Sequence, residues 1–199
     1  MKKKSAPKRQ RGRPRTFDRE GVLAVAIDAY LKGDPAYVSV NSVCKQAGVS
    51  KPSLYRELGG EDGLTRAALE EYAETVLTSV LDIVSSQSKF KTILSELTSF
   101  AAHDPRFESG CLYVKMRASK FRFGPQTQEK IEELERASRE AFVALLERSI
   151  TRGEWSGTQP GIAGRYLNEQ IGLALTQRAS GQNPEHIERM LVMALAIFE

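Results

Sequence analysis

The stretch that decides the fold covers residues 39–58 and reads SVNSVCKQAGVSKPSLYREL. Its spacing is typical of a helix-turn-helix, in which a small residue lies where two short helices cross and a glycine follows four positions later. Cys44 and Gly48 stand at those two positions, and Val49 and Leu54 are the apolar residues that hold the second helix in place. The stretch therefore predicts two short helices joined by a tight, glycine-containing turn.

The exposed side of the predicted second helix carries residue types that suit DNA. Polar and cationic side chains stand in or near its first turns, the part of this motif that enters the major groove. They are Ser50, Lys51, Ser53, Tyr55 and Arg56. Lys51 and the two serines suit contacts to base edges, whereas Tyr55 and Arg56 suit phosphate oxygens. The alternative is a solvated face on a helix that serves only the fold.

Helical signals continue along the rest of the chain, and we find no convincing pair of strands. Asp18 caps a first predicted helix that Gly33-Asp34-Pro35 ends, and Ser39 and Ser50 cap the two helices of the motif. A long apolar repeat follows the acidic pair Glu61-Asp62, whose charges suit a helix N-terminus. Five more helices are predicted over residues 93–102, 111–120, 128–151, 162–179 and 184–198.

These signals predict an all-α chain of about nine helices in three parts. Residues 1–16 form a disordered basic arm, because they combine prolines and cations with no apolar periodicity. Residues 17–62 form a three-helix DNA-binding domain that contains the helix-turn-helix. Residues 63–199 form a larger helical domain for ligand binding and dimerisation.

The last predicted helix is apolar on two sides. One stripe comprises Ile187, Met190, Leu191, Ala194, Leu195 and Phe198, and the opposite side carries Val192, Met193, Ala196 and Ile197. A helix that is apolar nearly all round must be buried on two faces. One face can pack on its own domain and the other on a second subunit, which indicates a homodimer. Burial of both faces within one chain is the alternative.

Composition favours a cytoplasmic protein without a metal or another cofactor. The chain has 199 residues, 41% of them apolar, which is enough for a core that needs no disulfide or metal. Its two cysteines, Cys44 and Cys111, are far apart and lack a CxxC spacing, so neither a disulfide framework nor a thiolate zinc site is expected. Polar residues follow the basic N-terminus where a signal peptide would be apolar, and no stretch is long enough to span a membrane.

The charge is distributed unevenly. Residues 1–16 hold eight Lys and Arg and no acid, whereas the whole chain carries a net charge of +4, so the remainder carries a net charge of −4. Clustered cations favour DNA because they displace its counterions. The sequence Arg11-Gly12-Arg13-Pro14 matches the core of an AT-hook, whose arginines follow a narrow A·T minor groove. A merely solubilising tail is the alternative.

The run from Phe17 to about Tyr72, above all VSVNSVCKQAGVSKPSLYRELGGEDGL, resembles the DNA-binding domain of the TetR/AcrR transcriptional regulators. The resemblance covers about a third of the chain. It implies an all-helical homodimer, a palindromic operator in double-stranded DNA, and a C-terminal cavity for a small-molecule inducer. It also implies a four-helix dimer interface built from residues 162–180 and 184–198 of each subunit.

The resemblance assigns roles to single residues. Ser39 matches the position that caps the first helix of the motif and contacts phosphate, and Tyr55 matches a tyrosine that holds the DNA backbone. The base-reading start of the recognition helix corresponds to Ser50, Lys51, Pro52 and Ser53. One departure is Glu61, which stands where the family usually has a lysine and would repel phosphate mildly. We expect the basic arm to supply what that turn lacks.

The larger predicted domain offers aromatic and sulfur-containing side chains for an inducer cavity, although most of them suit an ordinary core. The preferred candidates are Phe100, Phe107, Tyr113, Met116, Phe121 and Trp155, and Phe90, Phe123 and Phe142 are weaker ones. No convergent polar set identifies the ligand. Cys111 follows Gly110 as in many members of the family; it is interpreted as a packing residue, with redox sensing as the alternative.

Two other classes of protein compete with a regulator. An enzyme is disfavoured because His103 and His186 are isolated in sequence and no GxSxG, P-loop, GxGxxG or HExxH pattern occurs. A nucleoid-type architectural protein that uses only the basic arm is harder to exclude by sequence. A regulator would protect a discrete palindrome, whereas an architectural protein would coat A·T-rich DNA.

Overall fold

The structure, a computed structural model, describes residues 17–198, and this range contains helices and loops but no strand. The α-helices are α1 (Arg19–Lys32), α2 (Val40–Ala47), α3 (Lys51–Leu58), α4 (Glu61–Tyr72), α5 (Thr78–Ser85), α6 (Phe90–His103), α7 (Leu112–Ala118), α8 (Pro125–Thr151), α9 (Pro160–Ala179) and α10 (Pro184–Leu195). A π-helical turn, η1 (Ala73–Leu77), joins α4 to α5 without a break. Three 3₁₀ turns follow: η2 (Pro105–Phe107), η3 (Lys120–Arg122) and η4 (Ala196–Phe198). The prediction of an all-α chain with about nine helices is confirmed over the described residues.

The first three helices begin where their capping residues predict. Asp18 Oδ1 accepts a hydrogen bond from the Gly21 N–H at 3.0 Å. The hydroxyls of Ser39 and Ser50 each accept one at 3.2 Å from the backbone N–H three residues later. A side-chain acceptor at this position satisfies one of the N–H groups that a helix leaves unpaired. Each of these helices therefore begins after the capping residue that the sequence predicts, because that residue supplies a local hydrogen-bond acceptor.

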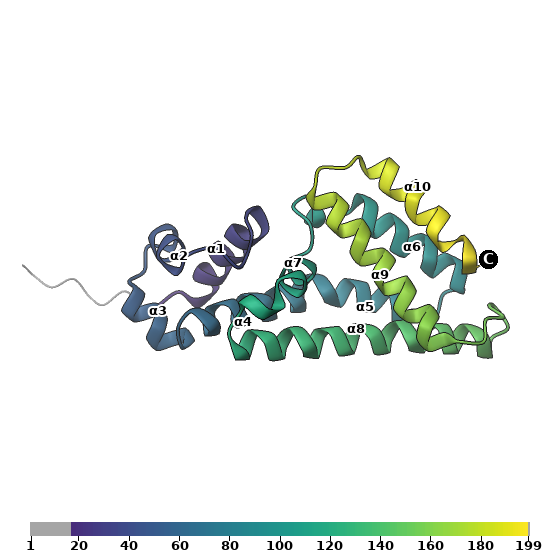
Figure 1. Cartoon of the computed structure of the whole chain (residues 1–199), viewed down its shortest axis with the longest axis horizontal. Coiled ribbons are helices and arrows are strands. Elements are labelled where there is room, and N and C mark those ends of the chain that lie inside the picture. The colour runs from purple at the N-terminus through teal and green to yellow at the C-terminus, as the bar shows by residue number, and fades with distance from the viewer. Residues whose placement is uncertain (1–16, 199) are drawn as a thin grey trace, which may run out of the picture.

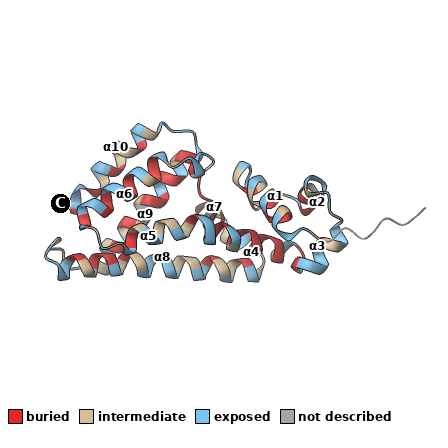
Figure 2. Ribbon diagram, turned by 180° about the vertical axis from the view of Figure 1, so that it is seen from behind, coloured by how far each residue is buried: buried red, intermediate tan, exposed pale blue. Residues whose placement is uncertain are grey.

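The molecule is elongated, and the small α1–α3 unit lies at one end of it (Figure 1). The continuous α4–η1–α5 rod and the long α8 run along the body, and α6, α9 and α10 gather at the far end. Buried residues follow the inner faces of all these helices (Figure 2). Helix α4 packs on both α1 and α8, so it is shared by the two parts. The predicted division after residue 62 falls inside this helix.

Gly63 allows α4 to begin directly on the end of α3. A Cβ atom added at this position would lie 1.6 Å from the Leu58 carbonyl oxygen, a separation that no side chain tolerates. The constraint is steric, because Gly63 lies within a regular helix. Close backbone contact therefore fixes the direction in which α4 leaves the N-terminal unit.

The acidic pair lies in the first turn of α4, as its charges predict, but neither carboxylate caps that helix. The N-cap of α4 is Gly60, which has no side chain to cap the helix. Asp62 instead reaches the N-terminus of α8, where its two carboxylate oxygens accept from the Gln126 N–H at 2.9 Å and the Thr127 N–H at 3.0 Å. The Thr127 hydroxyl, 2.7 Å from Asp62 Oδ1, completes the contact. Because Gly124, the N-cap of α8, also lacks a capping side chain, Asp62 caps α8 from a distant part of the sequence.

This contact predicts the effect of Asp62→Ala. The substitution leaves two N–H groups of α8 without their acceptor and removes the carboxylate contact of the Thr127 hydroxyl, so we expect a loss of about 2 kcal/mol in unfolding free energy. For a chain of this length the thermal midpoint should fall by roughly 4–8 °C. Asp82→Ala, which removes an exposed carboxylate in α5, is the matched control and should change stability by less than about 0.5 kcal/mol. Equal midpoints for the two variants in circular dichroism would contradict the role given to Asp62.

Candidate nucleic-acid interface and ligand cavity

The turn between α2 and α3 has the geometry that the sequence predicts. Gly48 adopts φ 66° and ψ 28°, a left-handed conformation that favours glycine, and its N–H donates to the Cys44 carbonyl. Cys44, Val43 and Leu54 are buried, and α2 packs against both α1 and α3. The two helices thus form a helix-turn-helix with α3 as its second member.

The candidate base-reading residues lie at the N-terminal end of α3. Ser50, Lys51 and Pro52 are exposed, and Ser53 is half-buried. The Ser50 hydroxyl donates to Ser53 Oγ at 3.1 Å while it also caps the helix. This arrangement orients both hydroxyls at the end of α3. Nothing in these contacts blocks a ligand from approaching the first turn.

The candidate phosphate-binding residues surround that turn. Tyr55 is 40% exposed, and the Lys51 ammonium lies 5.2 Å from the centroid of its ring. Arg56 is exposed and pairs with its neighbour Glu57 at 3.0 Å. Ser39 lies exposed at the start of α2. Lys45, in the last turn of α2, is an additional exposed cation on this unit that the spacing argument did not single out.

The helix-turn-helix unit has almost no net charge of its own. Residues 17–60 contain five Lys or Arg and five Asp or Glu. Three of the cations, Lys45, Lys51 and Arg56, belong to the 39–58 stretch, whose only acid is Glu57. Glu61 is exposed in the first turn of α4. The predicted groove-binding arginines, Arg11 and Arg13, lie outside the described residues.

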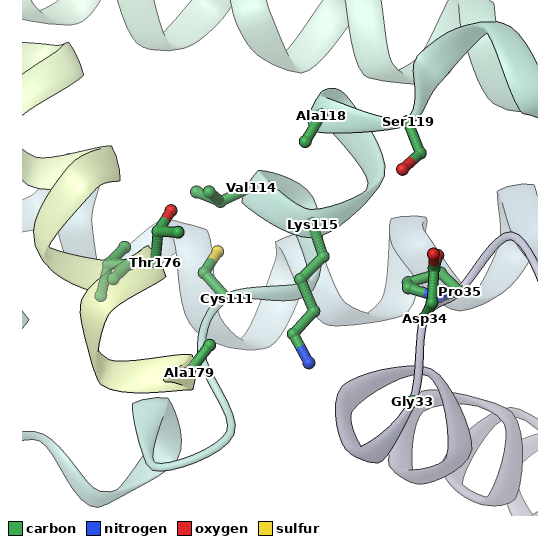
Figure 3. Close-up of a pocket in the computed structure, with 11 residues that line it drawn as sticks. Gly33, Asp34, Pro35, Cys111, Val114, Lys115, Ala118, Ser119, Thr176 and Ala179 are labelled. Carbon is green, nitrogen blue, oxygen red and sulfur yellow. The ribbon is translucent and has the colours of Figure 1, made fainter. Parts of the chain in front are cut away.

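A cavity of about 310 Å³ lies between the end of α1, helix α7 and helix α9 (Figure 3). None of the six preferred aromatic and sulfur-containing candidates lines it. Phe107 and Met116 are fully buried in the core, and Phe100 packs edge-on against Phe107 at 5.2 Å between ring centroids. The placement of Phe121 contradicts the prediction of a cavity-lining role, because its side chain is 87% exposed.

The remaining two candidates also have structural roles. Trp155 packs against Phe90 and Phe198, with ring centroids 6.4 Å and 5.6 Å away. Tyr113 borders a space of only about 40 Å³, together with Phe142. That space is far below the few hundred Å³ of a typical small-molecule site. Most of these candidates therefore belong to the core of the larger part, whereas the cavity lies between that part and the end of α1.

Helices α9 and α10 and the turn η4 carry exposed apolar side chains. Leu173, Val192, Met193 and Ile197 are exposed over 48%, 59%, 78% and 63% of their surfaces. A narrow groove of about 70 Å³ runs between the two helices beside Leu173 and Met190. The opposite face of α10 is buried through Ile187, Leu191 and Leu195. The predicted two-sided apolar character of this helix is therefore present in the structure.

Two further properties concern the described residues only. In the range 17–198, no cluster of three or more His, Cys, Asp or Glu side chains has the proximity needed to hold a metal ion. None of the helices in this range has the length and apolarity to cross a lipid bilayer.

The chain was compared with known proteins, and no protein-family model matches it. It is 26% identical over 170 residues to the uncharacterised HTH-type transcriptional regulator YezE of Bacillus subtilis, which covers 83% of this chain and 87% of the relative. It is 33% identical over 67 residues to the HTH-type transcriptional repressor ComR of Escherichia coli, a match to 34% of this chain and 32% of that protein.

A solved structure shows the same fold over nearly the whole length. It is that of a cysteine mutant of the TetR-family transcriptional regulator CifR in complex with 26-base-pair operator DNA, with a TM-score of 0.79 and 22% sequence identity. The similarity covers 94% of this chain and all of that one. The chain has the all-helical fold of the TetR/AcrR family of transcriptional regulators, which confirms at the level of the fold the family resemblance of its sequence.

Proposed function

We propose that this protein is a transcriptional regulator that binds a palindromic operator as a homodimer and is released from it by a small molecule. The observation that carries the proposal is the first turn of α3, where exposed Ser50 and Lys51 and half-buried Ser53 stand on a helix-turn-helix. Such a turn enters the major groove, where hydroxyl and ammonium groups read base edges. Repression is the form of regulation we favour.

The backbone contacts in this proposal fall to the N-cap of α2 and to the middle of α3. Ser39, Tyr55 and Arg56 hold phosphates, and Pro52 shapes the first turn of the recognition helix. Because residues 17–60 have equal numbers of cations and anions, much of the attraction to DNA comes from the eight cations of residues 1–16. Arg11 and Arg13 would enter the minor groove beside each half-site. The protein acts on DNA in the cytoplasm.

The dimer in this proposal uses the outer face of α9 and α10, covering residues 162–180 and 184–198. In the single chain, Leu173 of α9, Met193 of α10 and Ile197 of η4 are exposed large apolar side chains in this region. Exposed apolar surface of this kind marks interaction sites when it forms a patch. A C2 dimer pairs the same patch on both subunits, which suits a palindromic DNA site.

The release step in this proposal is non-covalent. Both cysteines are buried, and burial raises the pKa of the Cys111 thiol. The thiolate is the reactive form, so this shift lowers the reactivity of Cys111 near neutral pH. A ligand that prefers a conformation with wrongly spaced recognition helices lowers the affinity for DNA by linkage.

The DNA-binding role is tested with operator fragments selected from genomic DNA by the purified protein. Lys51→Ala should weaken binding to the selected fragment by about ten- to a hundredfold, as expected for the loss of a base contact, and should relax its sequence preference. Lys91→Ala, which removes an exposed cation from α6, should leave affinity unchanged. Fluorescence anisotropy and footprinting measure both effects.

The same assay separates a regulator from an architectural protein. Deleting residues 1–15 should weaken operator binding and reduce its dependence on salt concentration, yet leave a discrete palindromic footprint. If the deletion abolishes binding, Lys51→Ala has no effect and no discrete footprint is seen, the architectural alternative holds and the proposed function is wrong.

The dimer interface is tested by Met193→Glu, which places a carboxylate in the centre of the apolar face. We expect the native chain to have twice its monomer mass of 22.1 kDa in light scattering, and the variant to be monomeric and weak in operator binding. Phe121→Glu, at an apolar residue that is 87% exposed elsewhere, is the control and should remain dimeric. A native chain that is monomeric at micromolar concentration would overturn the dimer.

The non-covalent release step predicts that Cys111 resists alkylation in the folded protein. Iodoacetamide should modify neither cysteine over the time in which it fully labels the denatured chain, because both thiols are buried. Ser180→Cys supplies an exposed thiol as a positive control in the same experiment. Rapid labelling of native Cys111, followed by mass spectrometry, would restore the redox alternative.

A further inference from the structure

The cavity of about 310 Å³ is built by two parts of the chain that the proposed function requires to move relative to each other. Gly33, Asp34 and Pro35 contribute the wall at the end of α1, within the helix-turn-helix unit. The other walls come from α7 and α9 of the larger part. Its volume falls at the lower end of the range for small-molecule sites. A molecule in this cavity would contact both parts at once.

The cavity has an apolar end and a polar end. Cys111, Val114 and Ala179 form the apolar end, with the Thr176 side chain beside them (Figure 3), and Leu175 is a further apolar lining residue. Lys115, Asp34 and Ser119 lie toward α1 and supply its polar groups. A ligand that matches this division has a short apolar body and one polar head.

Lys115 is the cation of the cavity, and it already links the two parts. Its ammonium donates to the carbonyl oxygen of Leu31, in the last turn of α1. An ammonium has three donors, and this is the only hydrogen bond to the Lys115 ammonium found among the described residues. Partial burial lowers the pKa of Lys115, which shows that water compensates its charge incompletely. An anionic acceptor would compensate it better.

Asp34 is the opposing charge, and it limits the ligand to a single small anionic group. One of its carboxylate oxygens accepts from the Ala36 N–H at 3.0 Å, which ties the side chain to its own loop. Asp34 also attracts Lys115 electrostatically. An anionic ligand must therefore compete with Asp34 as well as with the Leu31 carbonyl for the lysine.

We propose that this cavity binds a small monocarboxylate with an apolar tail, whose carboxylate accepts from the Lys115 ammonium while the tail lies against Val114, Leu175 and Ala179. Binding draws Lys115 away from the Leu31 carbonyl and loosens the end of α1 from α7. The regulatory consequence rests on the proposed function: the helix-turn-helix unit becomes free to pivot, and operator affinity falls by linkage. The binding step itself does not depend on DNA.

Binding is tested by isothermal titration calorimetry on the full chain with octanoate as the probe, and with octanamide and octylamine as uncharged and cationic analogues of the same length. We expect octanoate to bind and the two analogues to bind at least roughly tenfold more weakly, because neither offers an anionic acceptor to the Lys115 ammonium. Lys115→Met should weaken octanoate binding to the level of octanamide. Asp34→Asn should strengthen octanoate binding, because it removes the competing carboxylate.

A substitution that fills the cavity tests whether octanoate binds there. Ala118→Leu adds bulk at an exposed position in the cavity wall and should abolish octanoate binding with an unchanged thermal midpoint, whereas Ala144→Leu, on the exposed face of α8, should bind normally. If octanoate fails to bind at millimolar concentration, binds no better than octanamide, or binds Ala118→Leu as tightly as the native chain, the proposal is wrong.

The consequence for DNA is measured separately, by the operator affinity of the native chain and of Lys115→Met with and without octanoate. Octanoate should lower the affinity of the native chain and leave that of Lys115→Met unchanged. Octanoate binding without any DNA binding would overturn the proposed function and leave the ligand site standing. Octanoate binding with unchanged operator affinity would overturn only the regulatory step.

Discussion

The hydrogen bonds from the N-terminus of α8 to Asp62 join the part of the molecule that carries the helix-turn-helix to the part that carries the cavity and the apolar outer face. Asp62 lies in the first turn of α4, immediately before Gly63, where α4 begins against the Leu58 carbonyl. The same turn therefore contacts α3 on one side and α8 on the other. Any change in the angle of α4 must alter one of these two contacts.

Long-range capping by a carboxylate occurs twice within residues 17–198. Helix α6, whose N-cap Lys89 has no capping bond, receives its acceptor from Glu154, 2.7 Å from the Phe90 N–H. Both capped helices begin after loops whose own side chains do not cap them. The unpaired N–H groups at a helix start are strong donors, so a carboxylate from another element fixes the start of each helix relative to that element. The orientations of α6 and α8 therefore depend in part on directional hydrogen bonds to Glu154 and Asp62.

A structural feature can be predicted from the sequence when its contacts join residues that are close together in the sequence. The caps at Asp18, Ser39 and Ser50 and the turn at Gly48 depend on residues within four positions, so the sequence alone predicts them. The role of Asp62 depends on residues more than sixty positions away, and a local pattern can only assign its charge to its own helix. The cavity is the extreme case, because its walls come from three distant segments. Hydrophobicity also failed to place Phe121, which lies outside the core in the short turn η3.

The cavity lies beside the polar contacts that join the two parts in addition to the packing of α4 on α1 and α8. Besides Asp62 with α8, they include Lys115 with the Leu31 carbonyl and Arg122 with Tyr37, whose guanidinium lies 4.8 Å from the ring centroid. A typical hydrogen bond contributes only about 0.5–1.5 kcal/mol net, so a ligand that replaces one of them needs little binding energy to shift the arrangement. Typical allosteric coupling free energies of about 1–3 kcal/mol are similar in size to the contribution of one or two such hydrogen bonds. A ligand at this junction acts directly on the contacts that orient the helix-turn-helix, whereas a ligand deep in the helical body would have to act through α4.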